Sequence, residues 1–87
     1  MIFTLRYSKK AQKAIKNLSA TDARRIVGAL EDLSEEERPE LFVKRLTDSP
    51  LYSLRVGVYR VILSISHDQC VILALKLAHR RNVYSNH

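Results

Sequence analysis

Two arginines flank the dipeptide Gly57-Val58 in a stretch of alternating polar and apolar residues. Glycine followed by another residue is typical of a two-residue hairpin turn, in which the glycine adopts a positive backbone angle. Such a turn would place Arg55 directly opposite Arg60 on one face of a two-stranded ribbon. Because like charges in this position destabilise a sheet, the pair predicts an anion such as phosphate between them. Alternatively, both side chains extend into solvent, or they pair with carboxylates of the acidic stretch 31–40.

A second group of candidates follows the last apolar run of the chain: His79, Arg80, Arg81 and Tyr84. Arginines close to an aromatic residue are typical of surfaces that contact phosphates and stack bases of single-stranded RNA. Tyr84 could instead anchor the segment by hydrophobic contact, and the whole segment could be a solvated arm. His79 is a candidate proton carrier, because imidazole titrates close to neutral pH, or else a packing residue.

The net charge favours a phosphate-rich partner. The chain holds 15 Lys and Arg against 9 Asp and Glu, which gives +6 at pH 7. Basic residues gather at the two ends of the chain, whereas most of residues 31–40 are acidic. A basic domain of this kind is typical of nucleic-acid binding, and the alternative is a basic protein that is merely soluble.

Length and composition limit the classes of protein that come into question. With 87 residues and 46% hydrophobic content, we expect one globular domain spanning residues 1–87 and no second domain with a cofactor cleft. The longest apolar run is far shorter than the roughly 20 residues that cross a bilayer, and no export leader is recognisable. Cys70 is the only cysteine, so it has no internal disulfide partner and no zinc-type spacing. We therefore expect a cytoplasmic protein with no membrane contact, no cofactor and no metal.

The elements that must position these side chains begin with a strand and two helices. Alternating apolar residues predict a strand at residues 2–6. Ser8 is a suitable N-cap for an amphipathic helix over residues 9–18. Ser19, with an acidic residue three positions later, predicts the start of a second helix that ends before Pro39. Two amphipathic helices so closely joined should form a hairpin that lies on a sheet.

From residue 51 onward the apolar residues repeat every second position. This period predicts strands at residues 52–56 and 59–65, joined by the Gly57-Val58 turn. Residues 70–77 are apolar almost throughout, which predicts a central strand with Cys70 as a core residue. The resulting class is α+β: a small single domain in which an N-terminal strand and a helix hairpin pack on a mainly antiparallel, twisted sheet, in the order β-α-α-β-β-β.

At this point the chain resembles the RelE/ParE superfamily of toxins from toxin-antitoxin modules. The resemblance covers nearly the whole chain and is carried by the element order, by SPLYSLRVGVYRVI at residues 49–62 and by HRRNVY at residues 79–84. The ending with its tyrosine is more similar to the RelE branch than to the ParE branch. The resemblance implies an mRNA endonuclease that works without metal, usually at the ribosomal A site, and that is neutralised by a cognate antitoxin protein.

The resemblance also implies site residues. Matched by position, the catalytic residues fall on Arg55, Arg60, Arg80 and Tyr84. Arg81, His79 and Ser53 are expected to contact RNA. Ser53 departs from the pattern, since the best-known member has a lysine there, and a catalytic cation is therefore missing.

The residue types suit cleavage of RNA by its own 2′-hydroxyl. That reaction needs an aligned nucleophile, a base, cations for the charged transition state and an acid for the leaving oxygen. The arginines would hold the phosphate, and Tyr84 would stack on a base or transfer a proton once neighbouring cations favour its ionised form. Two other functions remain open: a ParE-like toxin that binds a topoisomerase without cleaving RNA, and an RNA-binding member of weak or no activity.

Overall fold

The computed structural model describes residues 2–79 of the chain. Three predicted site residues, Arg80, Arg81 and Tyr84, lie outside this described part. Its elements follow in the order β1 (Thr4–Tyr7), α1 (Lys9–Lys16), α2 (Ala20–Ser34), the short 3-10 helix η1 (Pro39–Phe42), β2 (Lys44–Arg45), β3 (Tyr52–Val56), β4 (Tyr59–Ser66) and β5 (Val71–His79).

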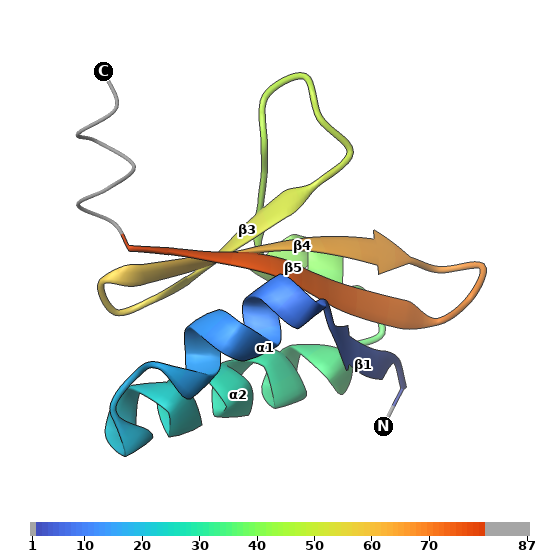
Figure 1. The fold of residues 1–87 in the computed structure, drawn as a ribbon. Helices are drawn as coiled ribbons and strands as arrows, with labels where there is room; N and C mark the ends of the chain where they lie inside the picture. Colours follow the sequence, from blue (N-terminus) through green and yellow to red (C-terminus); the bar gives the residue numbers. More distant parts are fainter. Residues whose placement is uncertain (1, 80–87) are drawn as a thin grey trace.

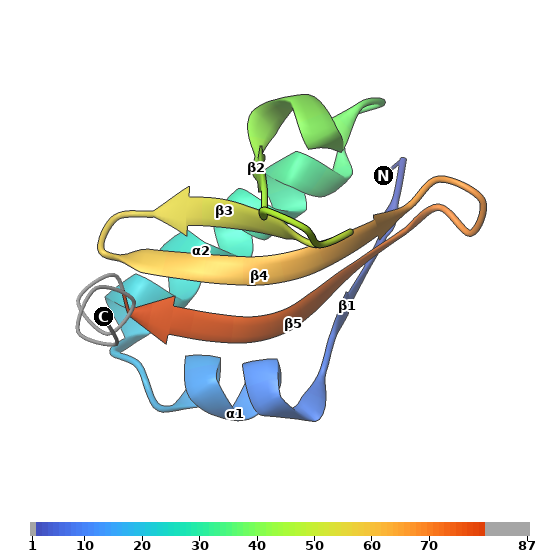
Figure 2. The same cartoon turned by 90° about the horizontal axis from the view of Figure 1, so that it is seen from above.

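The strands form one twisted sheet, and both helices lie on the same face of it (Figure 1). The strand order is β1-β5-β4-β3-β2, with β1 parallel to β5 and every other pair antiparallel. The view from above shows the opposite face, which the helices leave uncovered (Figure 2). We call this the open face. The predicted α+β class, with a helix hairpin on a mainly antiparallel sheet, is confirmed.

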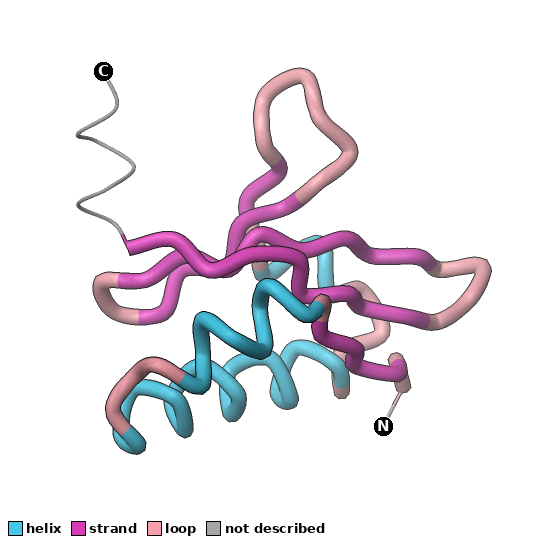
Figure 3. Tube along the Cα trace, in the orientation of Figure 1, coloured by secondary structure: helices cyan, strands magenta, loops and turns pink. Residues whose placement is uncertain are grey.

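Both helices begin where the capping residues predict. The Ser8 hydroxyl accepts a hydrogen bond from the Ala11 amide at 3.0 Å, and the Ser19 hydroxyl accepts one from the Asp22 amide at 3.2 Å. The tube in Figure 3 shows the two helices lying side by side under the strands. Their apolar sides meet the sheet in one core, made of Phe3, Ala11, Ile26, Leu30, Leu33, Val61, Leu63, Ile72 and Ala74.

The hairpin between β3 and β4 has the predicted turn and register. Gly57 takes a φ of +60°, the angle that glycine adopts at little cost and that side chains disfavour. Val56 pairs with Tyr59, and Arg55 pairs with Arg60. The turn therefore fixes which side chains of the two strands share a face.

Three features differ from the sequence-based expectation. A short fifth strand, β2, extends the sheet beyond β3 where the sequence pattern is ambiguous. Cys70 is not a core residue: it is exposed in the turn between β4 and β5, at a φ of 55°, and its thiol donates to the His67 carbonyl at 3.5 Å. The pairing of β4 with β5 shifts register beside Leu63, because Ile62 pairs with Lys76 and Leu63 with Ala74. Leu75 is thus the extra residue of a β-bulge.

No helix within residues 2–79 is both long enough and apolar enough to cross a bilayer.

Candidate functional site

The open face carries Arg55 and Arg60 as a directly opposed pair. Arg55 is exposed and Arg60 half-buried. Neither guanidinium forms an ion pair with a carboxylate of residues 2–79. Within the described residues, the acidic stretch 31–40 therefore does not neutralise the two arginines, which was one of the alternatives. The pair therefore presents two positive charges on one small area of the sheet.

Two lysines that sequence reasoning missed lie in the adjoining row of the open face. The register aligns four residues across the sheet, one from each of four strands: Lys44, Ser53, Ile62 and Lys76. Neighbouring strands are about 4.8 Å apart, so the two lysines lie on either side of Ser53 and Ile62. Lys76 reaches this face because the bulge at Leu75 reverses the alternation of β5. No sequence signal indicated that reversal.

A hollow of about 500 Å³ opens beside the arginine pair. Among residues 2–79 it is lined by Leu41, Phe42, Val43, Lys44, Ser53, Leu54, Arg55 and Arg60, none of which carries a carboxylate. The Nε atom of Arg60 is shielded from solvent and has no hydrogen-bond partner among the described residues. A buried donor without a partner costs free energy.

Ser53 and His79 have different places relative to this hollow. Ser53 lines it and is only 6% exposed, so its side chain lies low between its neighbours on β2 and β4. His79 instead pairs with Tyr59 on the face that the helices cover, and the two rings meet edge to face with centroids 5.3 Å apart. The structure therefore brings Ser53 together with the arginine pair and leaves His79 apart from it.

Comparison with known proteins identifies the family. A family model described as the ParE toxin of type II toxin-antitoxin systems, parDE, matches residues 5–84. A chain of the archaeal RelE-RelB complex from Pyrococcus horikoshii OT3 is 34% identical; the match covers 92% of this chain and 97% of that one, with a TM-score of 0.78. The protein belongs to the RelE/ParE toxin superfamily. It is a toxin of a type II toxin-antitoxin system with a RelE-like fold, as the resemblance predicted.

Two further solved structures share the fold of the toxin. A chain of the RelBE2 complex from Mycobacterium tuberculosis is 23% identical, with 92% of this chain and 100% of that chain covered and a TM-score of 0.77. A chain of the intact Escherichia coli RelBE complex is 21% identical; the match covers 88% of this chain and 95% of that one, with a TM-score of 0.73. A comparison with curated protein sequences gave no match.

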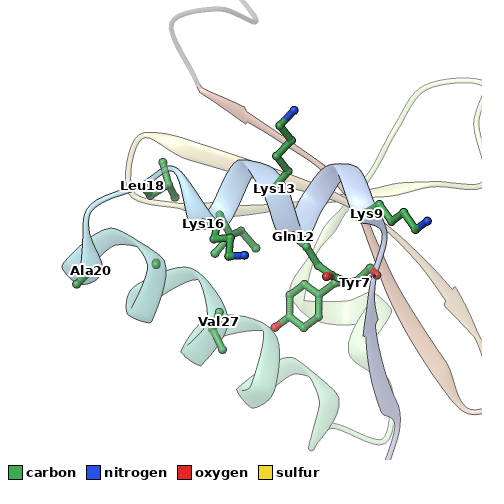
Figure 4. A pocket seen from close by; sticks show the side chains of 10 residues that line it. Tyr7, Lys9, Gln12, Lys13, Lys16, Leu18, Ala20 and Val27 are labelled. Atoms are coloured by element: carbon green, nitrogen blue, oxygen red, sulfur yellow. Dashed lines mark hydrogen bonds between the residues drawn. The ribbon is translucent and has the colours of Figure 1, made fainter.

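The toxin has a second hollow on the far side of the molecule, between its two helices (Figure 4). It measures about 730 Å³ and combines apolar side chains of both helices with lysines of α1 at its rim. The Tyr7 ring points into it, and the Tyr7 hydroxyl is shielded without a hydrogen-bond partner among residues 2–79. Burial, and next the negative charge of Glu31, raise the pKa of Tyr7 above its ordinary value.

Proposed function

We propose that the toxin is an endoribonuclease that cleaves mRNA on the open face of its sheet. One observation carries the proposal: Arg55 and Arg60 are directly opposed without carboxylate partners among residues 2–79, beside a hollow that both side chains line. A phosphate between the two guanidinium groups would neutralise their repulsion. Phosphate esters of an RNA backbone fit this requirement.

The lysines extend the positive charge in the direction that a strand of RNA would follow. Lys44 and Lys76 lie in the row next to the arginine pair, on opposite sides of it. Successive phosphates could therefore each meet a cation, which provides affinity that does not depend on base sequence. Ser53 carries no charge. Lys44 pairs with it directly across on β2 and would supply the cation that is absent at position 53.

The proposed reaction is an internal transesterification. The RNA 2′-oxygen attacks the adjacent phosphorus, the 2′-proton passes to a base, and the bond to the 5′-oxygen breaks as that oxygen receives a proton. The products are a 2′,3′-cyclic phosphate and a 5′-hydroxyl. Arg55, Arg60 and Arg80 would stabilise the charge that develops on the phosphoryl oxygens.

The C-terminal residues complete this proposal. Tyr84 would stack on a base or transfer a proton, and Arg81 would contact the backbone. His79 remains a proposed RNA contact only if the strand passes around the end of β5, because its ring packs against Tyr59 on the other face.

We propose two partners besides mRNA. The solved relatives are complexes of RelE with RelB, and by likeness to them a cognate antitoxin would bind this toxin and suppress its activity. The ribosome would present mRNA to the open face in its A site, where the codon is single-stranded. Both would act in the cytoplasm.

The test is cleavage of a defined mRNA by the purified toxin, with and without 70S ribosomes that hold a codon in the A site. The proposal expects cuts at A-site codons, and products that end in a cyclic phosphate. Arg55→Ala and Arg60→Ala should each lower the rate by at least tenfold, about 1.4 kcal/mol of transition-state stabilisation. Lys10→Ala, which removes an exposed cation of α1, should leave the rate unchanged. Cleavage that is equal in all variants would refute the assignment of the site.

A second candidate function is binding of a topoisomerase without RNA cleavage, because the matching family model is that of the ParE toxin. The two functions separate in growing cells. If induced expression stops DNA replication and relaxes plasmid supercoiling while mRNA stays intact, the topoisomerase function holds. If mRNA is cut at codons and supercoiling is normal, the endoribonuclease holds.

A further inference from the structure

Two consecutive large apolar side chains border the hollow on the open face and are mostly in contact with solvent. Leu41 is 65% exposed and Phe42 is 59% exposed, and both line the hollow together with Lys44, Arg55 and Arg60. Neither side chain contributes to the core. An aromatic ring held in water beside three cations calls for a functional explanation.

The backbone around Phe42 is anchored on both sides, which holds this residue beside the hollow. Pro39 is buried, and the Glu40 carboxylate lies 2.9 Å from the His67 ring nitrogen Nε2. The Leu41 amide donates to the Arg38 carbonyl at 3.1 Å. On the other side Val43 packs against the core, directly before β2 begins. The short helix η1 therefore holds its last residues at the rim of the hollow.

The chemistry of the hollow indicates which kind of molecule would cover the ring. An apolar protein segment would remove water from Lys44, Arg55 and Arg60 without offering them anions. Single-stranded RNA offers both parts: bases whose flat faces stack on aromatic rings, and phosphates for the cations.

We propose that Phe42 is the platform on which one RNA base stacks while the neighbouring phosphate meets Lys44 and the arginine pair. This inference rests on the proposed RNA function, and it adds a residue that positions the substrate. Base stacking is tolerant of sequence but sensitive to ring size, so purines should gain more from Phe42 than pyrimidines do.

The experiment measures binding of a short single-stranded RNA whose 2′-positions are all methylated, so that cleavage cannot occur. A fluorescent purine, 2-aminopurine, is moved along the oligonucleotide, and its quenching reports stacking. We expect one position to be quenched by the wild-type toxin and not by Phe42→Ala, with an affinity loss on the order of tenfold for the variant. Phe42→Trp should restore binding and Phe42→Leu should not. Val58→Ala is the matched control, because Val58 is 50% exposed and lines no part of the hollow.

Replacing the quenched base by an abasic nucleotide completes a double-mutant cycle. The abasic site should weaken binding to the wild type and have no further effect on Phe42→Ala. Additive losses, or equal affinity of Phe42→Ala and the wild type, would overturn the stacking role while leaving the RNA function intact. A wild-type toxin that binds no RNA would instead refute the function itself. If Phe42→Ala weakens only the complex with the antitoxin, the ring belongs to a protein interface and the inference fails.

Discussion

The hydroxyl of Ser8 donates a hydrogen bond of 2.7 Å to the carbonyl oxygen of Leu75, the extra residue of the bulge in β5. The same hydroxyl accepts from the Ala11 amide at the start of α1. A bulge leaves a backbone group without its partner in the sheet, and here Ser8 supplies that partner. One side chain thus joins the helix start to the irregularity that turns Lys76 towards the open face.

We predict that Ser8→Ala destabilises the toxin more than Ser19→Ala does. Each variant loses a helix N-cap, at a cost of about 1 kcal/mol. Ser8→Ala also leaves the Leu75 carbonyl unpaired, which should add roughly 1 kcal/mol. Urea denaturation measures both free energies of unfolding. Equal losses in the two variants would show that the bond to Leu75 contributes nothing.

The arginine pair should behave as an anion site even without RNA. Inorganic pyrophosphate should raise the melting temperature of the wild type, because it binds the folded state between the two guanidinium groups. Arg60→Gln should abolish the increase. Without an anion, Arg55→Thr should be neutral or stabilising by a few tenths of a kcal/mol, since it removes like-charge repulsion across the strands. A melting temperature that pyrophosphate leaves unchanged would contradict the site.

Lys44 and Lys76 should each neutralise one phosphate of bound RNA. Lys44→Ala and Lys76→Ala are expected to weaken binding for all sequences alike, and to lower the slope of log affinity against log salt by about 0.7 each. Fluorescence anisotropy with methylated RNA at four salt concentrations gives the slopes. Lys10→Ala is the control and should keep the wild-type slope. A change in slope for Lys10→Ala as large as that for Lys44→Ala would indicate unspecific charge attraction.

Tyr7 should make the toxin sensitive to alkali. Its folded pKa is raised, so its contribution to stability is complete below the unfolded pKa near 10.0 and is lost as the pH rises through the folded value. Tyr7→Phe should therefore reduce the fall in melting temperature between about pH 9 and 11. At pH 7 it should cost little, because the hydroxyl has no partner among residues 2–79. An alkaline fall in melting temperature as large in Tyr7→Phe as in the wild type would contradict this role of Tyr7.

Local patterns in the sequence were sufficient for the helices, the hairpin and the arginine pair. A capping serine and a repeat of three to four residues determine where a helix starts and which side it buries. Gly57 determines the turn. In a two-residue hairpin, residues at equal distances before and after the turn pair with each other, so the turn alone places Arg55 opposite Arg60. The alternation of polar and apolar residues along the strands likewise predicts which of their side chains enter the core.

Only the tertiary structure decided which side chains join the arginine pair. Lys44 belongs to a two-residue strand that exists only because β3 offers it a partner. Lys76 lies on the open face and His79 on the helix-covered face because a bulge, whose carbonyl is satisfied by Ser8 from 67 positions away in sequence, reverses the alternation of β5 after Ala74. The apolar residues that follow Cys70 predicted that it belongs to the buried strand. In the structure Cys70 is instead the last residue of the turn at 67–70, and it is exposed there. Contacts between separate strands and with α1 set the positions of Lys44 and Lys76, and no period in a single segment encodes them.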